Sequence, residues 1–228
     1  MVSIICCTMR EQFMENVFRN YENQLMSEKE MIIILNNDHL HLAKWKARAR
    51  SFKNVSVYQL PGETTLGECL NAAIQKAIYP YIAKFDDDDY YAPHYLQQSW
   101  DTLQETKADV IGKRTVYMYF EDEKLLAINS PSREKMFVRQ GLKGATLFFN
   151  KKICENIHFP ALNLGEDTVF LKQCVKNNLK LYSADKRNYV CIRTFRSGHH
   201  TWNVNNAALK RKSSIVCHTE DFKSLILE

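Results

Sequence analysis

The sequence lacks several features that define special classes of protein. No stretch approaches the ~18 consecutive apolar residues that span a bilayer, so we expect any membrane contact to be peripheral. The first strand-like segment, Met1–Thr8, has no basic leader, unlike a secretory signal peptide. No linker, repeat or low-complexity tract interrupts the 228 residues, which predicts a single domain.

Cysteine pairing also lacks any recognisable pattern. The seven cysteines are an odd number and contain no C-x-x-C pair. Cys6, Cys7 and Cys191 lie within apolar runs, where a free thiol behaves as a small apolar side chain. We therefore interpret the cysteines as reduced residues of a cytoplasmic protein rather than as a disulfide framework or a zinc site.

Charge of neither sign is in large excess. The net charge is +5, and only Lys44–Arg50 and Lys210–Lys212 form local basic clusters. Such runs are usually solvated surface, although a mildly basic protein suits an anionic ligand. The dispersed charge gives no reason to expect a nucleic-acid partner.

Apolar residues in the first half recur with alternating strand and helix periods. Intervening helical stripes include Phe13, Val17 and Tyr21. Strands that follow one another through helices predict right-handed crossovers and a doubly wound, Rossmann-like α/β fold with a mostly parallel central sheet. The expected strands are Val2–Cys7, Met31–Leu35, Val55–Leu60 and Tyr81–Phe85.

The rhythm changes after about residue 108, which predicts a smaller mixed α+β sub-region packed against the first sheet. We expect one domain over residues 1–203, divided into halves 1–107 and 108–203, followed by a tail at 204–228. The expected elements are a helix at Gly165–Val175 and strands at Asp109–Phe120, Leu125–Ile128, Gly144–Phe149, Leu179–Ser183 and Tyr189–Thr194.

Four consecutive carboxylates follow the strand that ends at Phe85. At such spacing they repel one another, and a divalent ion with oxygen ligands removes that penalty and can also bind phosphate oxygens. Alternation along an extended backbone places Asp86 and Asp88 on one side and Asp87 and Asp89 on the other. We expect the second pair to turn away and support the helix after Pro93. The simpler alternative is an acidic loop that only caps this helix.

Two later segments carry further polar groups. Glu166 and Asp167 open an amphipathic helix, either as residues that favour a helix start or as a general base for a hydroxyl. His200 follows Arg193, and a neutral imidazole can join carboxylates on a metal while arginine suits a diphosphate. A histidine in this position is otherwise an ordinary surface or core residue.

With these motifs the chain resembles a family 2 nucleotide-sugar glycosyltransferase of the GT-A fold over roughly residues 1–203. The acidic motif with its following proline and the later Glu-Asp pair are the specific part of the resemblance. The matching segments are Val2–Ile5 with Thr8, Leu66-Gly67 with Asn71, Phe85–Pro93, Gly165–Asp167 and His200–Trp202.

The resemblance implies roles for these residues. Asp86 and Asp88 would form the DxD element that holds Mn²⁺ or Mg²⁺, with Asp88 a direct ligand and Asp86 near the ribose or the metal's water. His200 would be the third protein ligand. Asp167 would be the catalytic base, with Glu166 as its alternate or an acceptor-binding group.

The same resemblance assigns the donor site. Thr8 and the pair Asn36-Asn37 would line the nucleoside pocket. Asn71 and Arg193 are the other residues assigned to donor binding. The family usually carries an acidic pair where this chain has two asparagines, but an amide still offers a donor and an acceptor to a uracil edge.

The implied function is inverting, metal-dependent transfer of a sugar from a nucleotide diphosphate donor, a UDP-sugar first, to a hydroxyl acceptor in polysaccharide or cell-surface glycan synthesis. One alternative is an inactive nucleotide-sugar-binding scaffold. Another is a nucleotidyltransferase, but Cys6–Arg10 contains no glycine for the phosphate loop that such enzymes carry.

Overall fold

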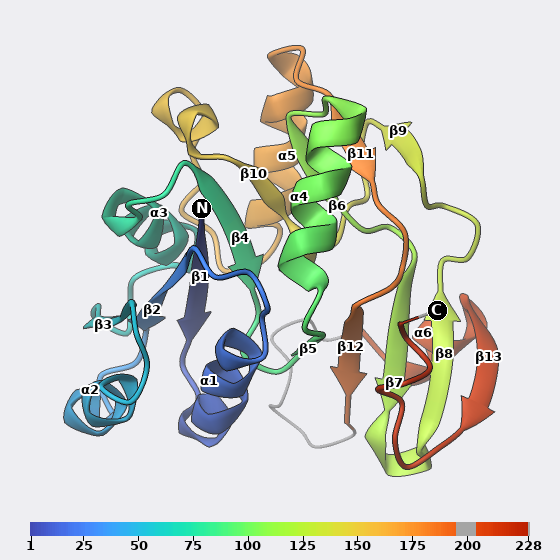
Figure 1. Ribbon diagram of the computed structural model, residues 1–228, viewed down its shortest axis with the longest axis horizontal. Helices are drawn as coiled ribbons and strands as arrows, with labels where there is room; N and C mark the ends of the chain where they lie inside the picture. Colours follow the sequence, from blue (N-terminus) through green and yellow to red (C-terminus); the bar gives the residue numbers. More distant parts are fainter. Residues whose placement is uncertain (195–203, 228) are drawn as a thin grey trace.

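The computed structural model describes residues 1–194 and 204–227 as a mixed α/β fold built on two sheets (Figure 1). Helices lie against the larger sheet, and the smaller sheet follows at one end. Across the larger sheet the strands are β3 (Val55–Gln59), β2 (Lys29–Leu35), β1 (Val2–Thr8), β4 (Tyr81–Phe85), β10 (Phe148–Asn150), β6 (Val110–Gly112), β11 (Leu181–Ser183) and β9 (Met136–Val138).

The four strands of the first half are all parallel, as the sequence predicted. The apolar runs of β1, β2 and β4 are buried on both faces, as is usual for parallel strands, whereas the edge strand β3 is partly exposed. Beyond β4 the direction alternates, since β10 is antiparallel to both β4 and β6 while β11 is parallel to β6.

Alternate residues of these strands pack against different helices. Ile4 and Ile33 face α1 (Met14–Glu22), α2 (Leu42–Ala49) and α4 (Tyr95–Thr106). Ile5 and Ile34 face α3 (Leu66–Lys76) and α5 (Glu166–Lys176) on the opposite side of the sheet. The period of two along a strand therefore gives two apolar layers, each covered by helices.

The second sheet contains β13 (Ser213–His218), β8 (Leu125–Asn129), β7 (Val116–Phe120), β12 (Tyr189–Arg193) and β5 (Tyr90–Tyr91), in that order. The segment that we expected to be a tail contributes α6 (Asn206–Arg211) and β13, which pairs antiparallel with β8. Phe222 then packs its ring against Tyr90 and Tyr119. The described end of the chain is thus part of the second sheet.

Two strand predictions from the sequence are wrong. Asp109–Phe120 is two strands, because the chain leaves the large sheet after β6 and enters the small sheet as β7. Gly144–Phe149 begins with a 3₁₀ turn, and only Phe148–Asn150 forms a strand. The 3₁₀ turns are η1 (Glu11–Phe13), η2 (Glu121–Glu123), η3 (Gly144–Thr146) and η4 (Lys151–Glu155).

Strands β4 and β5 belong to different sheets, so the loop that joins them connects the two sheets. That loop is Asp86–Asp89, the acidic cluster. No helix within residues 1–194 and 204–227 has the length and apolarity needed to cross a membrane.

Candidate active site

Burial alternates along the acidic loop. Asp87 and Asp89 are buried, whereas Asp86 and Asp88 are only partly covered, with side-chain exposures of 39% and 12%. This agrees with the predicted alternation, although the chain bends at residues 87–89 and does not continue as an extended strand. Asp86 and Asp88 are therefore the pair that a ligand can approach.

The buried carboxylate of Asp87 is held by residues that follow β1. It accepts hydrogen bonds from Thr8 Oγ1 and from the guanidinium of Arg10. Arg10 Nη2 also lies 3.1 Å from Asp88 Oδ2, so one cation bridges two neighbouring carboxylates. Burial, with the charge of Asp88, raises the pKa of Asp87 to about 6 although Arg10 acts in the opposite direction.

Asp89 ties the acidic loop to the second sheet. Its carboxylate accepts a hydrogen bond from the hydroxyl of Tyr189 and another from Ile192 N at 3.1 Å. Neither Asp87 nor Asp89 supports the following helix, whose N-cap residue His94 makes no side-chain capping bond. The capping role expected for this pair is wrong, because both carboxylates point to other elements.

Two asparagines of α1 fix the backbone of the same loop. Asn16 Nδ2 donates to the carbonyl oxygens of Asp87 and Asp89 at 2.8 and 2.9 Å, and Asn20 Nδ2 donates to that of Asp89 at 2.8 Å. These bonds satisfy carbonyl groups that lie outside any strand. The loop is therefore held from both sheets and from a helix.

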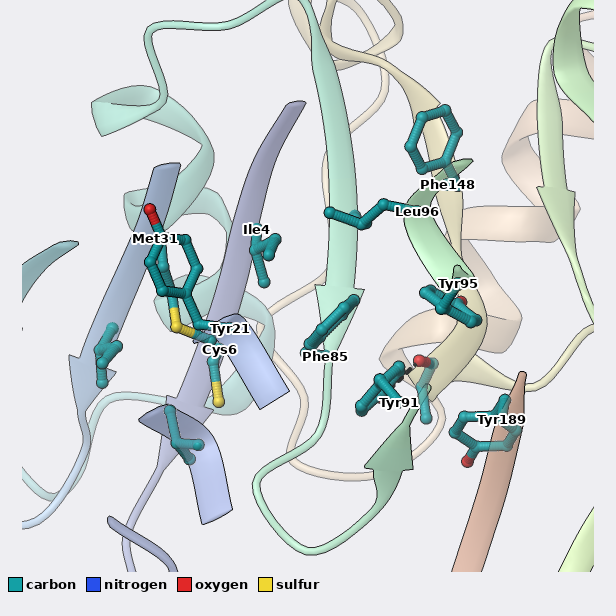
Figure 2. Close-up of a cluster of buried hydrophobic side chains, with 14 of the residues drawn as sticks. Ile4, Cys6, Tyr21, Met31, Phe85, Tyr91, Tyr95, Leu96, Phe148 and Tyr189 are labelled. Atoms are coloured by element: carbon teal, nitrogen blue, oxygen red, sulfur yellow. Dashed lines mark hydrogen bonds between the residues drawn. The ribbon is translucent and has the colours of Figure 1, made fainter. Parts of the chain in front are cut away.

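Aromatic rings form the floor beneath the loop (Figure 2). Phe85 and Tyr91 stack with ring centroids 3.7 Å apart, and Tyr95 and Tyr189 pack around Tyr91. The hydroxyl of Tyr91 accepts a bond from Asp86 N at 2.8 Å and donates to Ala145 O at 2.7 Å. Tyr91 thereby fixes the start of the acidic loop against the turn η3.

Lys84 is a site residue that the sequence reasoning missed. Its side chain is buried at the end of β4 and forms an ion pair with Asp86. Burial lowers the pKa of Lys84, but the charges of Asp86, Glu166 and Asp167 outweigh burial and leave the pKa raised. A lysine within a buried strand is unusual unless paired, and this was the available signal. Arg10 was missed too, since nothing local in the sequence marks it.

The Glu166-Asp167 pair meets the acidic loop at this lysine. Glu166 is buried, and burial raises its pKa while Lys84 offsets part of the increase. Asp167 is half-buried, and its Oδ1 accepts from Thr168 N at 2.5 Å. The structure thus brings the two acidic motifs together around one ammonium group, some eighty residues apart in the chain.

The Asp167 carboxylate lies directly against the backbone of η3. A Cβ added at Gly144 would overlap Asp167 Oδ2 and lie 3.0 Å from its Cγ. Gly144 therefore leaves the space in which the carboxylate sits.

We expect Gly144→Ala to displace the Asp167 side chain and lower turnover by about 10-fold or more, because small misplacements of a catalytic group are costly. Thermal unfolding and turnover with a nucleotide sugar measure the two effects. In an Asp167→Ala background the same glycine substitution should have a smaller cost in stability, since the overlapping carboxylate is gone. An equal cost in both backgrounds contradicts this interpretation.

The residues assigned to the nucleoside pocket lie at adjacent strand ends. Thr8 and Asn36 follow paired strands, and Asn36 N donates to Thr8 O at 2.8 Å. Asn36 Nδ2 donates to Thr64 O at 2.7 Å, and Asn37 Nδ2 donates to Met9 O at 3.1 Å. The amide donors are thus engaged by neighbouring loops.

The side chains of Asn71 and Arg193 bind other parts of the protein. Arg193 is buried, with Nε 3.1 Å from Asn206 Oδ1 and Nη2 2.9 Å from Val204 O. Asn71 exchanges two hydrogen bonds with the backbone of Phe159, at 2.8 and 3.1 Å. His200 and Trp202 lie outside the described residues.

Asn71→Ala should lower the free energy of unfolding by about 1–3 kcal/mol, because it leaves two backbone groups of Phe159 without partners. Chemical denaturation of the variant measures this loss. Unchanged stability together with weaker binding of a nucleotide sugar would instead support the donor-binding role that the resemblance implies.

The comparison with known proteins agrees with this geometry. The sequence model of Glycosyl transferase family 2 matches residues 3–160. The chain belongs to this family. No curated protein sequence matches it.

Solved structures of glycosyltransferases share the GT-A fold of this family 2 chain. S. aureus TarS 1–349 in complex with UDP-GlcNAc is 19% identical with a TM-score of 0.68, over 90% of this chain and 61% of TarS 1–349. The mannosyltransferase PcManGT from Pyrobaculum calidifontis, in complex with GDP-Man and Mn²⁺, is 15% identical with a TM-score of 0.63, over 92% of this chain and 62% of that protein. The present chain therefore spans about three fifths of their lengths.

Proposed function

We propose that this chain is a metal-dependent inverting glycosyltransferase that moves a sugar from a nucleoside diphosphate, UDP first among them, to an acceptor hydroxyl. One observation carries the proposal. At the carboxyl end of β4, Lys84 forms an ion pair with Asp86 and lies within reach of the charges of Glu166 and Asp167, while the neighbouring Asp88 lies beside Arg10. Ligands of open α/β sheets bind at such strand ends.

Asp86 and Asp88 fit a hard divalent ion, because both present carboxylate oxygens at the surface of the loop. No group of three potential ligands converges among residues 1–194 and 204–227. Mg²⁺ is commonly held by one or two carboxylates with substrate phosphates, so a two-residue site suffices. When bound, Mn²⁺ or Mg²⁺ would neutralise charge that develops on the leaving diphosphate. His200 stays a proposed third ligand.

The cations beside Asp86 and Asp88 also contribute to the proposed site. Lys84 and Arg10 hold Asp86 and Asp88 before any ligand arrives, and the buried Asp87 keeps Arg10 in place. Preorganised carboxylates lose less side-chain entropy when a ligand binds. Asn36 and Asn37, at the end of β2, would meet the base. Their amides suit uracil or another base with mixed donors and acceptors, but pairing through Nδ2 would replace the present bonds to Thr64 O and Met9 O.

Asp167 is the proposed base. It would accept the proton of the acceptor hydroxyl as that oxygen attacks the anomeric carbon from the face opposite the diphosphate. The new glycosidic C–O bond forms as the C–O bond to the diphosphate breaks, and the nucleoside diphosphate leaves with the electron pair. One displacement inverts the anomeric configuration. Positioned base catalysis of this kind contributes ~10²–10⁴-fold.

Titration calorimetry with UDP-glucose, UDP-GlcNAc and GDP-mannose, with and without Mn²⁺, tests the proposal. We expect tight binding only with metal, followed by slow release of free sugar without an acceptor, and an inverted anomer by NMR. Binding without release or transfer indicates a scaffold protein. Release of pyrophosphate from UTP and glucose 1-phosphate, supplied in a parallel assay, indicates a nucleotidyltransferase. No binding to any donor overturns the proposal.

A polysaccharide or cell-surface glycan product is proposed from the resemblance alone. A cytoplasmic location, with any membrane contact peripheral, is proposed from the cysteines and from the lack of a long apolar run in the sequence. The acceptor class is argued below from the structure.

A further inference from the structure

A pocket beside the candidate active site is lined by basic side chains. It has a volume of about 530 Å³, and its lining includes Arg114, Arg133, Lys143 and Lys212 but no carboxylate of the described residues. These residues come from four segments: the β6–β7 connection, the chain after β8, the chain before η3, and the end of α6. Only the tertiary fold brings them together.

The backbone around this basic pocket is well fixed. Ser130 N donates to Lys212 O at 3.0 Å, which joins two of the segments. Arg133 N donates to Thr115 Oγ1 at 3.0 Å, although its side chain is exposed. Gly141 adopts a φ of +86°, and a Cβ there would lie 3.0 Å from Arg114 Nε. The absence of a side chain at Gly141 therefore lets the guanidinium lie against the backbone.

Two acidic residues near this pocket form ion pairs with cations that do not line it. Glu134, next to Arg133, pairs with Lys186 at 3.5 Å, and Glu123 pairs with Lys210 rather than with Lys212. In the described part of the chain, no carboxylate forms an ion pair with Arg114, Arg133 or Lys212. Like charges gathered around one hollow repel, and a bound anion relieves that repulsion.

The basic pocket adjoins the proposed base. Lys143 lines the pocket, and the next residue, Gly144, contacts the carboxylate of Asp167. Burial lowers the pKa of Lys143, and of the nearby charges Lys212 lowers it further while Asp167 raises it. Lys143 therefore stands within electrostatic reach of both the pocket and the base.

We propose that this pocket binds an acidic group, a phosphate or a carboxylate, on the sugar acceptor, so that the chain glycosylates an anionic acceptor. The inference rests on the proposed function, which places the acceptor hydroxyl at Asp167. An acceptor with its hydroxyl there has the basic pocket immediately beside it. The donor diphosphate is assigned to Asp86 and Asp88, which do not line this pocket.

The test is an NMR titration of the full chain saturated with UDP and the diamagnetic ion Mg²⁺, so that the donor site is filled. Glycerol 3-phosphate and glucuronate are the anionic probes, and glycerol and glucose are their uncharged counterparts. We expect saturable shifts of the Arg114 and Arg133 Nε–H signals with the anions only. The two anionic probes then show whether phosphate or carboxylate binds better.

Two neighbouring substitutions supply the matched control. Lys212→Gln removes a pocket cation and should weaken anion binding about tenfold, equivalent to ~1.4 kcal/mol. Arg211→Gln removes an exposed cation that does not line the pocket, and should change binding by less than about twofold. Both side chains are exposed, so both variants should fold.

Three results contradict the proposal: no saturable shift, equal shifts with the uncharged probes, or equal weakening by both substitutions. UDP binding is measured first in the same sample. Failure to bind UDP or any other nucleotide counts against the proposed function, while the anion titration still reports on the basic pocket. Normal UDP binding without anion binding counts against the pocket alone.

Discussion

Asp88→Asn should reduce sugar transfer by about 10²–10³-fold, the usual effect of removing one group that stabilises charge in the transition state. Asp88 is partly exposed on the acidic loop, and its Oδ2 lies 3.1 Å from Arg10 Nη2. The amide keeps the shape of the side chain but loses the charge that a divalent ion requires. Turnover with a nucleotide sugar across a Mn²⁺ titration measures the effect, with thermal unfolding as the check on the fold.

Asp101→Asn is the control for this substitution. Asp101 is exposed on α4 and accepts a hydrogen bond from Gln97 at 2.8 Å, so its charge has no part in the proposed site. We expect its activity to stay within about twofold of the unmodified chain, as for most surface charges. If Asp88→Asn retains both transfer and dependence on Mn²⁺, the acidic loop is not the metal site.

Asp167→Asn should reduce turnover by ~10²–10⁴-fold with little change in the affinity for the donor, because it removes only a positioned base. The side chain is half-buried beside Gly144 and is separate from the carboxylates assigned to the diphosphate. Single-turnover transfer and titration of the donor measure the two quantities independently.

Glu166→Gln is the variant to compare with Asp167→Asn. Glu166 is buried and shares Lys84 with Asp86, so its loss should alter stability and the position of Lys84 more than proton transfer. We expect a smaller decrease in turnover than for Asp167→Asn. If turnover is unchanged in Asp167→Asn but decreases in Glu166→Gln, the base is Glu166.

Local patterns predicted much of the fold. The apolar runs at β1, β2 and β4 gave the parallel strands nearly to the residue, because burial on both faces leaves a direct record in composition. The alternation of burial along Asp86–Asp89 also agreed with the prediction, although the loop is bent and the buried carboxylates are held by Thr8 and Tyr189. The errors arose where the chain changes sheets, as between β6 and β7, because a strand has the same local pattern in either sheet.

The acidic loop shows clearly which features the sequence determines and which only the tertiary structure decides. The sequence by itself determined that a buried strand ends in four carboxylates, that they alternate, and that an acid pair follows later in the chain. Only the tertiary structure decided that Asp87 and Asp89 bind Arg10 and Tyr189 rather than the next helix. It also decided that Lys84 joins the two acidic motifs, and that Arg114 and Lys212 line one pocket. Periodicity is a property of neighbours along the chain, whereas the partner of a charge depends on which distant segments the folded core places beside it.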